Sequence, residues 1–323
     1  MRAAWYEKNG PAHEVLKVGD IPDVTPLPGE VRVRLKASAV NPSDVKARAG
    51  ARPIRWPQLI PHSDGAGIID AVGKGCEHRL GERVWVFNGQ WDRAFGTAAE
   101  AITLASALAQ PLPLGVSFEA GACLGIPVMT AHRALFADGS IAGKTVWVSG
   151  GAGVVGHYAI QLAKWAGARV VTTVSNAAKA TLALTAGADV VINYHEQDVV
   201  ETIKRTVGGV DRIVEVDFGR NLPHAVQVLN DDAVIACYAS SSIPRPVYPY
   251  PDLLWRNPQI RQVFVYTMAQ SAKDQAHQDI ALWLKQTSPI FSIAHRFALS
   301  DIVKAHEVVE SGQKMGHVLL TID

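Results

Sequence analysis

The sequence has little of what a disulfide-stapled or membrane-embedded protein needs. Its 323 residues include three cysteines, which lie far apart and show no C-x-x-C spacing: Cys76, Cys123 and Cys237. Such scattered cysteines argue against a disulfide framework and a cysteine-rich zinc lobe, and they fit a reducing cytoplasm. No apolar run approaches the roughly 20 residues of a membrane span. The first residues also lack the apolar core of a signal peptide. We therefore expect a cytoplasmic protein with no membrane partner.

An excess of either charge is also absent. Lys and Arg total 31 against 30 Asp and Glu, which gives a formal net charge of +1. This balance gives no electrostatic reason to expect nucleic acid or an anionic membrane as the main partner. Hydrophobic residues make up 48% of the chain and charged residues 19%, ordinary values for a globular protein. The length predicts two or three domains.

Two regions of different texture follow one another along the chain. Residues 1–120 alternate short apolar runs with Pro and Gly, which predicts a small β-barrel or sandwich. From Lys144 onward strand and helix patterns alternate, which predicts a parallel sheet covered on both faces. Strands are expected at 31–35, 67–72, 83–87, 145–149, 169–174, 190–192, 210–216, 233–238 and 317–322, and helices at 155–166, 177–186, 199–207, 222–229, 274–285 and 300–311.

Residues 241–258 contain five prolines, which predict a loop without regular structure. Three aromatic residues stand in this segment: Tyr248, Tyr250 and Trp255. They suit either stacking on a flat acceptor or packing in an interface.

A glycine-rich turn is the sharpest local feature. Gly151, Gly153 and Gly156 form G-x-G-x-x-G between a predicted strand and a predicted helix. Such a motif alone is weak, because a glycine-rich turn without a ligand can arise by chance. Here strand, turn, helix and second strand follow in the order of a dinucleotide-binding unit. Backbone N–H groups and the helix dipole would then hold the pyrophosphate. The predicted phosphate-binding residues are Gly151, Ala152, Gly153, Val154, Val155 and Gly156.

The end of the second strand of this unit favours NADPH over NADH. An NAD site usually places Asp or Glu about 20 residues after the glycines, yet no acidic residue occurs from Ala168 through Ala188. Ser175, Asn176 and Lys179 stand there instead, and these groups suit a 2′-phosphate. Lys179 alone could equally be a solvated helix lysine. The predicted cofactor site also includes Tyr194 and Tyr238.

The order of several short motifs resembles a known family. These motifs are VNPSD at 40–44, PHSDGAG at 61–67, LGERV at 80–84, the glycine turn, GAD at 187–189 and GHVLL at 316–320. Over nearly the full length the chain resembles zinc-independent medium-chain dehydrogenases/reductases, closest to the NADPH:quinone oxidoreductase (zeta-crystallin-like) branch. The resemblance implies an α/β fold in which a GroES-like β-rich catalytic domain (1–121 and 268–323) accompanies a Rossmann doubly wound parallel-sheet domain that binds NADP (122–267). It also implies a cofactor cleft between the domains, and a homodimer or homotetramer joined through the Rossmann sheets.

Departures from the zinc-dependent relatives argue against a metal. Their three catalytic zinc ligands fall on Asn41, Ser63 and near Ile126, which cannot form a tetrahedral N/S site. His62 and Asp64 offer two candidate ligands with no third. Two smaller departures from quinone reductases are Val154, at a position that is often glycine, and His132, which replaces the tyrosine of a Thr-Ala-Tyr motif.

Hydride delivery to an already electrophilic acceptor suits a metal-free cleft. Asn41, carried over from the family position, is a candidate to hydrogen-bond the developing oxyanion, with Asp44 and His132 as weaker candidates. Asn41 could equally be a turn residue before Pro42, and Asp44 a capping carboxylate. The leading hypothesis is an NADPH-dependent quinone oxidoreductase. An NADPH-dependent 2-alkenal or enone reductase of the same fold is the alternative. A third hypothesis from another class is an NADPH-binding structural or RNA-binding protein of the crystallin type.

Overall fold

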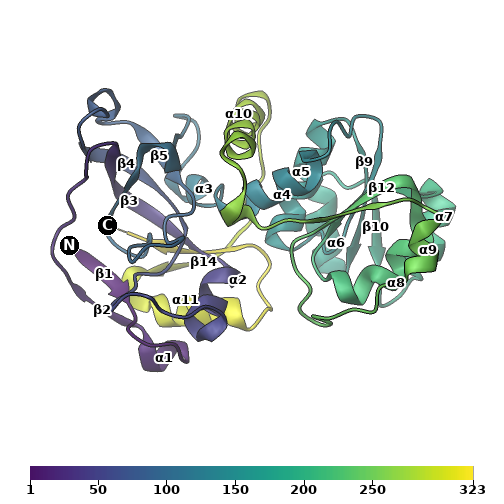
Figure 1. Ribbon diagram of the computed structural model, residues 1–323, viewed down its shortest axis with the longest axis horizontal. Helices are drawn as coiled ribbons and strands as arrows, with labels where there is room; N and C mark the ends of the chain where they lie inside the picture. The colour runs from purple at the N-terminus through teal and green to yellow at the C-terminus, as the bar shows by residue number, and fades with distance from the viewer. Residues whose placement is uncertain (323) are drawn as a thin grey trace. The chain divides into compact units, whose positions relative to one another are not determined.

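The computed structural model describes residues 1–322 and divides the chain into two compact units (Figure 1). Of the described residues, unit 1 comprises 1–126 and 291–322, and unit 2 comprises 127–290. The division differs from the expected domains mainly at the second boundary, because residues 268–290 fall in unit 2. Their helix α10 (Gln270–Gln286) packs there through contacts such as the edge-on stacking of Trp283 against Tyr158.

A seven-stranded sheet forms the centre of unit 1. Strand β3 (Glu30–Val40) alternates buried and half-buried positions along its first half, and Val31, Val33 and Leu35 have no exposed surface. Its neighbours run in the order β14-β15-β3-β4-β5-β7, while β6 also pairs with β3. The strands are β4 (Asp64–Val72), β5 (Arg83–Val86), β6 (Ala101–Ala105), β7 (Ala109–Pro111), β14 (Ile293–Ala298) and β15 (His317–Thr321).

The C-terminal segment completes this N-terminal sheet. Strand β15 pairs antiparallel with β3, with Val318 opposite Val40. Helix α11 (Ile302–Glu310) packs its apolar residues into the same core as Val45 of helix α2 (Pro42–Lys46). The smaller elements of unit 1 are β1 (Arg2–Trp5), α1 (Ala12–Val15), β2 (Lys17–Asp20), a π-helical segment at Ala47–Ala51 and α3 (Phe118–Ala122).

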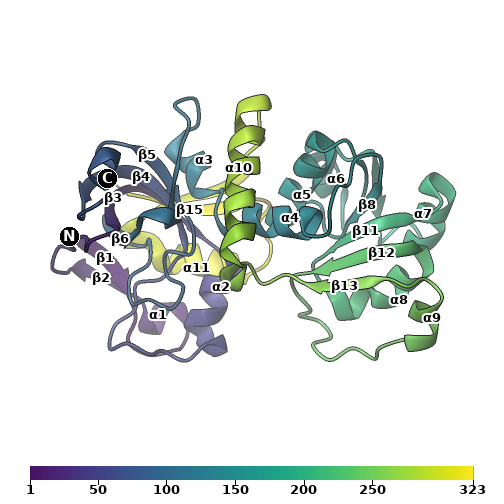
Figure 2. The same ribbon diagram turned by 45° about the horizontal axis from the view of Figure 1, so that its top comes forward.

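Unit 2 is a doubly wound parallel sheet, as predicted. Its order is β10-β9-β8-β11-β12-β13, and every pair is parallel. Figure 2 shows α5 on one side of the sheet and α8 on the other. The strands are β8 (Thr145–Val148), β9 (Arg169–Val174), β10 (Val190–Asn193), β11 (Val210–Glu215), β12 (Leu229–Cys237) and β13 (Gln259–Gln262). The helices are α4 (from Ile126 of unit 1 to Phe136), α5 (Val154–Trp165), α6 (Ala177–Thr185), α7 (Val199–Val207), α8 (Phe218–Val228), α9 (Tyr250–Leu254) and α10.

The expectation of a fully irregular segment at 241–258 is wrong in one place. Tyr250–Leu254 forms the short helix α9, with Pro251 in its first turn. Proline is tolerated there because the first N–H groups of a helix have no partner within the helix. Helix α8 likewise begins earlier than expected, at Phe218, and includes Pro223. No helix within residues 1–322 is both long and apolar enough to cross a membrane.

Candidate functional site

Close packing and one left-handed residue together shape the glycine turn of unit 2. Gly150, which precedes the predicted motif, has a φ of +69°, the left-handed conformation that favours glycine. A Cβ on Gly151 would lie 2.1 Å from Thr172 Oγ1, and a Cβ on Gly156 would lie 2.4 Å from the Gly150 carbonyl oxygen. Gly153 is the N-cap of α5. Gly150 therefore needs glycine for its conformation, and Gly151 and Gly156 need it for their close contacts.

A pocket of about 450 Å³ lies at the carboxyl ends of the strands of unit 2. It is lined by Ser149 and Gly150 after β8 and by Val216 and Asp217 after β11. The strand order reverses between β8 and β11, and open α/β sheets bind their ligands at this switch point. Of the predicted cofactor residues, Tyr194 lines this pocket.

Two of the three residues predicted to select the cofactor lie together at the end of β9. Lys179 Nζ donates to Ser175 Oγ at 2.9 Å, which holds the ammonium and the hydroxyl side by side. Asn176 has a local role, because its Oδ1 accepts the Lys179 backbone N–H at 2.9 Å and caps α6. Ser175 and Lys179 thus form a small polar pair suited to an anion.

Sequence reasoning missed a buried polar cluster beneath this pocket. Glu215 ends β11, and its Oε1 accepts Ser149 Oγ–H at 3.1 Å and Asn221 Nδ2–H at 2.8 Å. Burial raises the pKa of the Glu215 carboxyl. The predicted residue Tyr238 meets the same strand, since its backbone N–H donates to the Glu215 carbonyl oxygen at 3.1 Å. The available signal was an acidic residue directly after the apolar pair Ile213 and Val214.

Asn41 and Asp44 lie together in unit 1, at the start of α2. The Asn41 backbone N–H donates to Asp44 Oδ2 at 2.8 Å, so Asp44 closes a capping box. Asn41 also donates one amide N–H to Asp64 Oδ2 at 2.7 Å. Asp64 accepts the Ile126 backbone N–H at 2.9 Å as well. The amide of Asn41 is thereby oriented by a buried carboxyl group and keeps a second N–H.

The carboxyl groups of Asp44 and Asp64 are both buried, and burial raises their pKa values. Burial raises the pKa of Asp44 to about 7, against the opposing effects of the Asn41 N–H and the Arg52 charge. Burial also raises the pKa of Asp64 well above its ordinary value. Asp44 Oδ1 has no hydrogen-bond partner within the described chain. A carboxyl group with this pKa can exchange a proton near neutral pH.

His62, just before β4, is used by the fold. His62, with a φ of 76°, places Nδ1 3.0 Å from Ser38 Oγ and Nε2 2.9 Å from His306 Nε2. Burial lowers the pKa of His62 to about 3. Ser63 Oγ is buried and has no hydrogen-bond partner among residues 1–322. Across residues 1–322, no three His, Cys, Asp or Glu side chains gather in a way that could hold a metal ion.

His132 belongs to unit 2, whereas Asn41 and Asp44 belong to unit 1. It sits on α4, and its Nε2 is 2.8 Å from Asp279 Oδ2 of α10. Its ring also stacks at a tilt on Phe136, with the centroids 4.8 Å apart. Burial lowers the pKa of His132, although the Asp279 carboxylate opposes this effect. The contact with Asp279 joins α4 to α10.

Comparisons with known proteins agree with the fold of both units. Residues 27–114 match the family described as alcohol dehydrogenase GroES-like domain, and residues 154–281 match zinc-binding dehydrogenase. The chain is 32% identical to quinone oxidoreductase of Rattus norvegicus, over 98% of this chain and 96% of the rat protein. The solved structure of Escherichia coli quinone oxidoreductase complexed with NADPH superposes with a TM-score of 0.85 at 27% identity, covering 99% of this chain and 100% of that one. A structure of an NAD-dependent alcohol dehydrogenase superposes with a TM-score of 0.86 at 29% identity, covering 100% of both chains.

A GroES-like β unit and a doubly wound α/β unit in one chain define a medium-chain dehydrogenase/reductase. Within that class, the chain belongs to the quinone oxidoreductase family and is an oxidoreductase. The family resemblance and the fold class predicted from the sequence are both confirmed.

Proposed function

We propose that this protein is an NADPH-dependent quinone oxidoreductase that works without a metal. The observation that carries the cofactor assignment is the Lys179–Ser175 pair at the end of β9, where Nζ and Oγ are 2.9 Å apart. An NAD-specific site would place a carboxylate near this position, and a carboxylate would repel a 2′-phosphate. The NADPH complex of the E. coli relative supports the cofactor assignment, and the rat quinone oxidoreductase supports the reaction class.

The residues of unit 2 fit a dinucleotide. Gly151 and Gly156 let the turn pack against Thr172 and the Gly150 carbonyl group, where a Cβ would collide. This packing gives the tight turn between strand and helix that a pyrophosphate site needs. We assign the pyrophosphate to Gly151–Gly156, the 2′-phosphate to Ser175 and Lys179, and the rest of the cofactor to the pocket that Tyr194 lines. Tyr238 stays a predicted contact. When bound, NADPH supplies a hydride, and the protein provides its orientation.

The residues of unit 1 fit the oxygen side of the reaction. Asn41 has a second amide N–H in addition to the one held by Asp64. We propose that it hydrogen-bonds the acceptor oxygen as negative charge develops there. Asp44, with a pKa raised by burial to about 7, is the proposed local proton reservoir. His132 remains a candidate for the wall of the active site.

The metal-free assignment rests on the donor atoms at the three positions where zinc-dependent relatives carry ligands. Asn41 binds Asp64 there, Ser63 offers a hydroxyl, and Ile126 has no donor side chain. This set cannot hold zinc in tetrahedral N/S coordination.

An absorbance assay at the reduced-nicotinamide band tests the proposal. With an ortho-quinone as acceptor, wild type should oxidise NADPH far faster than NADH. With a short 2-alkenal as acceptor, it should oxidise NADPH more slowly than with the quinone. Lys179→Ala should lower kcat/KM for NADPH by about 10-fold or more, since it removes a charge-assisted contact, and should leave that for NADH almost unchanged. Lys204→Ala removes an exposed lysine of the same unit as the matched control.

Three results would contradict parts of the proposal. Equal use of NADH would refute the cofactor assignment. Turnover of the alkenal alone would favour the enone reductase. NADPH binding without any turnover would favour a binding protein.

We also propose a homodimer, or a homotetramer built from it, in the cytoplasm. Strand β13 is the last strand of its sheet, and such an edge can pair with a second copy. Light scattering of the purified protein tests the oligomeric state.

A further inference from the structure

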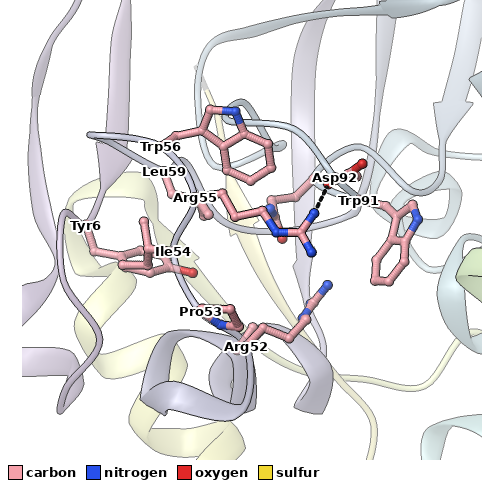
Figure 3. A pocket seen from close by; sticks show the side chains of 11 residues that line it. Tyr6, Arg52, Pro53, Ile54, Arg55, Trp56, Leu59, Trp91 and Asp92 are labelled. Atoms are coloured by element: carbon pink, nitrogen blue, oxygen red, sulfur yellow. Dashed lines mark hydrogen bonds and ion pairs between the residues drawn. The ribbon is translucent and has the colours of Figure 1, made fainter.

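Unit 1 contains a second pocket, of about 210 Å³, that the predicted site residues do not explain. Figure 3 shows its lining, in which aromatic rings alternate with charged side chains. The residues that matter most are Tyr6, Arg52, Arg55, Trp56, Trp91 and Asp92. Two loops far apart in the sequence, around residues 52–56 and 90–92, supply most of them.

The lining carries two guanidinium groups against one carboxylate. Arg55 Nη1 lies 2.9 Å from Asp92 Oδ1, and the two side chains are 68% and 63% exposed. An ion pair between side chains this exposed contributes little to stability, so a ligand anion can compete for Arg55 at small cost. The balance of formal charge in the pocket therefore favours an anion.

Arg52 is arranged against an aromatic ring. Its Cζ lies 5.2 Å from the centroid of the Trp91 ring, within the range of a cation–π contact. A guanidinium group carries five N–H donors, so Arg52 can keep its contact with the ring and still donate to a carboxylate or sulfonate. Trp56 and Trp91 give the pocket apolar faces that suit a flat aromatic ring (Figure 3).

The pocket adjoins the segment that bears the proposed oxygen-side residues. Ala47, which lines it, starts the π-helical segment that directly follows α2, and α2 carries Asp44 after its N-cap Asn41. The positive charge of Arg52 also reaches Asp44 and Tyr6, because it lowers the pKa of both groups against the larger effect of burial. A molecule held by Arg52 thus lies near α2, the helix that carries Asp44.

We propose that this pocket selects planar aromatic acceptors that carry an acidic substituent, a carboxylate or a sulfonate, which Arg52 and Arg55 bind. The inference rests on the proposed function and narrows its substrate class from quinones in general to anionic aromatic quinones.

The test compares ortho-naphthoquinone with its sulfonated derivative, which differ in charge but share the ring system. Wild type should have the higher kcat/KM for the sulfonated quinone. Arg52→Gln should lower the ratio of the two kcat/KM values by about 10-fold, the effect of one charge-assisted hydrogen bond. Arg55→Gln, on a more exposed side chain, should lower it in the same direction. Lys74→Gln removes an equal charge from unit 1 outside the pocket and should leave the ratio at the wild-type value.

A ratio that stays at the wild-type value in both arginine variants would overturn the proposal, as would a wild-type preference for the neutral quinone. If wild type turns over neither quinone, the proposed function fails. A binding measurement then tests the proposed anion selectivity of the pocket on its own. In that case tryptophan fluorescence is titrated with naphthalene sulfonate and with neutral naphthol. Tighter binding of the sulfonate that weakens about 10-fold in Arg52→Gln supports the pocket. Equal binding of both probes refutes it.

Discussion

Replacing Asp44 by Asn should change how stability depends on pH. Asp44 is fully enclosed in unit 1, and burial raises its pKa from 3.8 to about 7. The folded protein therefore keeps this proton up to about pH 7, whereas the unfolded chain releases it near pH 4. Because the folded state binds the extra proton within this window, the free energy of unfolding falls as pH rises through it. Asn at this position has no proton to release, and its Oδ1 can still accept the Asn41 N–H.

The magnitude follows from the width of the window. Each pH unit inside it changes the stability of the wild type by about 1.4 kcal/mol, so the group contributes roughly 3 kcal/mol between pH 5 and pH 7. Above pH 7 the contribution levels off, since Asp44 is ionised in both states. The difference in stability between Asp44→Asn and wild type should therefore rise by about 3 kcal/mol over this range and then stay constant.

Guanidinium denaturation at several pH values from 5 to 8 measures this difference. The free energy of unfolding should fall with denaturant concentration at the same slope in both proteins. Asp20→Asn removes an exposed carboxylate from the same unit and serves as the control. Asp64 contributes a trend of the same sign to both proteins. The charge of Asp44 also raises the pKa of Asp64, so the difference between the two proteins reports Asp44 together with this coupling. Parallel stability curves for wild type and Asp44→Asn would refute the reasoning, because they would mean that Asp44 is ionised in the folded state throughout.

Two further substitutions test unit 2. Gly156→Ala should destabilise the protein by about 1–3 kcal/mol and weaken NADPH binding at least ~10-fold, because its Cβ would lie 2.4 Å from the Gly150 carbonyl oxygen. Gly115→Ala, with nothing within 4 Å of the new Cβ, should do neither in thermal melts and cofactor titrations. Asp279→Ala should cost about 1–2 kcal/mol, because it leaves the buried His132 Nε2 without its partner. Unchanged denaturation midpoints for Asp279→Ala would show that this bond does not stabilise the fold.

Local signals were enough to predict most of the framework. The helix expected at 177–186 forms at Ala177–Thr185, and the one expected at 199–207 forms at Val199–Val207, because each begins after a capping side chain and ends before a glycine. The glycine turn was found for the same reason, since strand, turn and helix are adjacent in the chain. What the motif did not reveal is that the left-handed residue is Gly150, because the conformation of the turn depends on how β8 and α5 pack together.

Features that depend on long-range contact were not predicted. Arg52 and Trp91 form one pocket wall, although 38 residues separate them and neither belongs to a motif. Asp44 looked like a capping carboxylate, and it is one, but its burial under the rest of unit 1 also raises its pKa. Sequence periodicity reports which face of an element is apolar, whereas it does not report what covers a polar residue at its end.

Arg52 links the raised pKa of Asp44 to the proposed anion-binding pocket of unit 1. Burial favours the protonated form of Asp44, while the charge of Arg52 favours the ionised form. An anionic acceptor held by Arg52 would offset that positive charge, so binding it should raise the pKa of Asp44 further and keep its proton in place. Hydride addition to a quinone creates negative charge on oxygen, which needs a proton afterwards. A pocket that takes an acidic acceptor would thus prepare the carboxyl group beside it to donate, which a neutral acceptor of the same shape would not do.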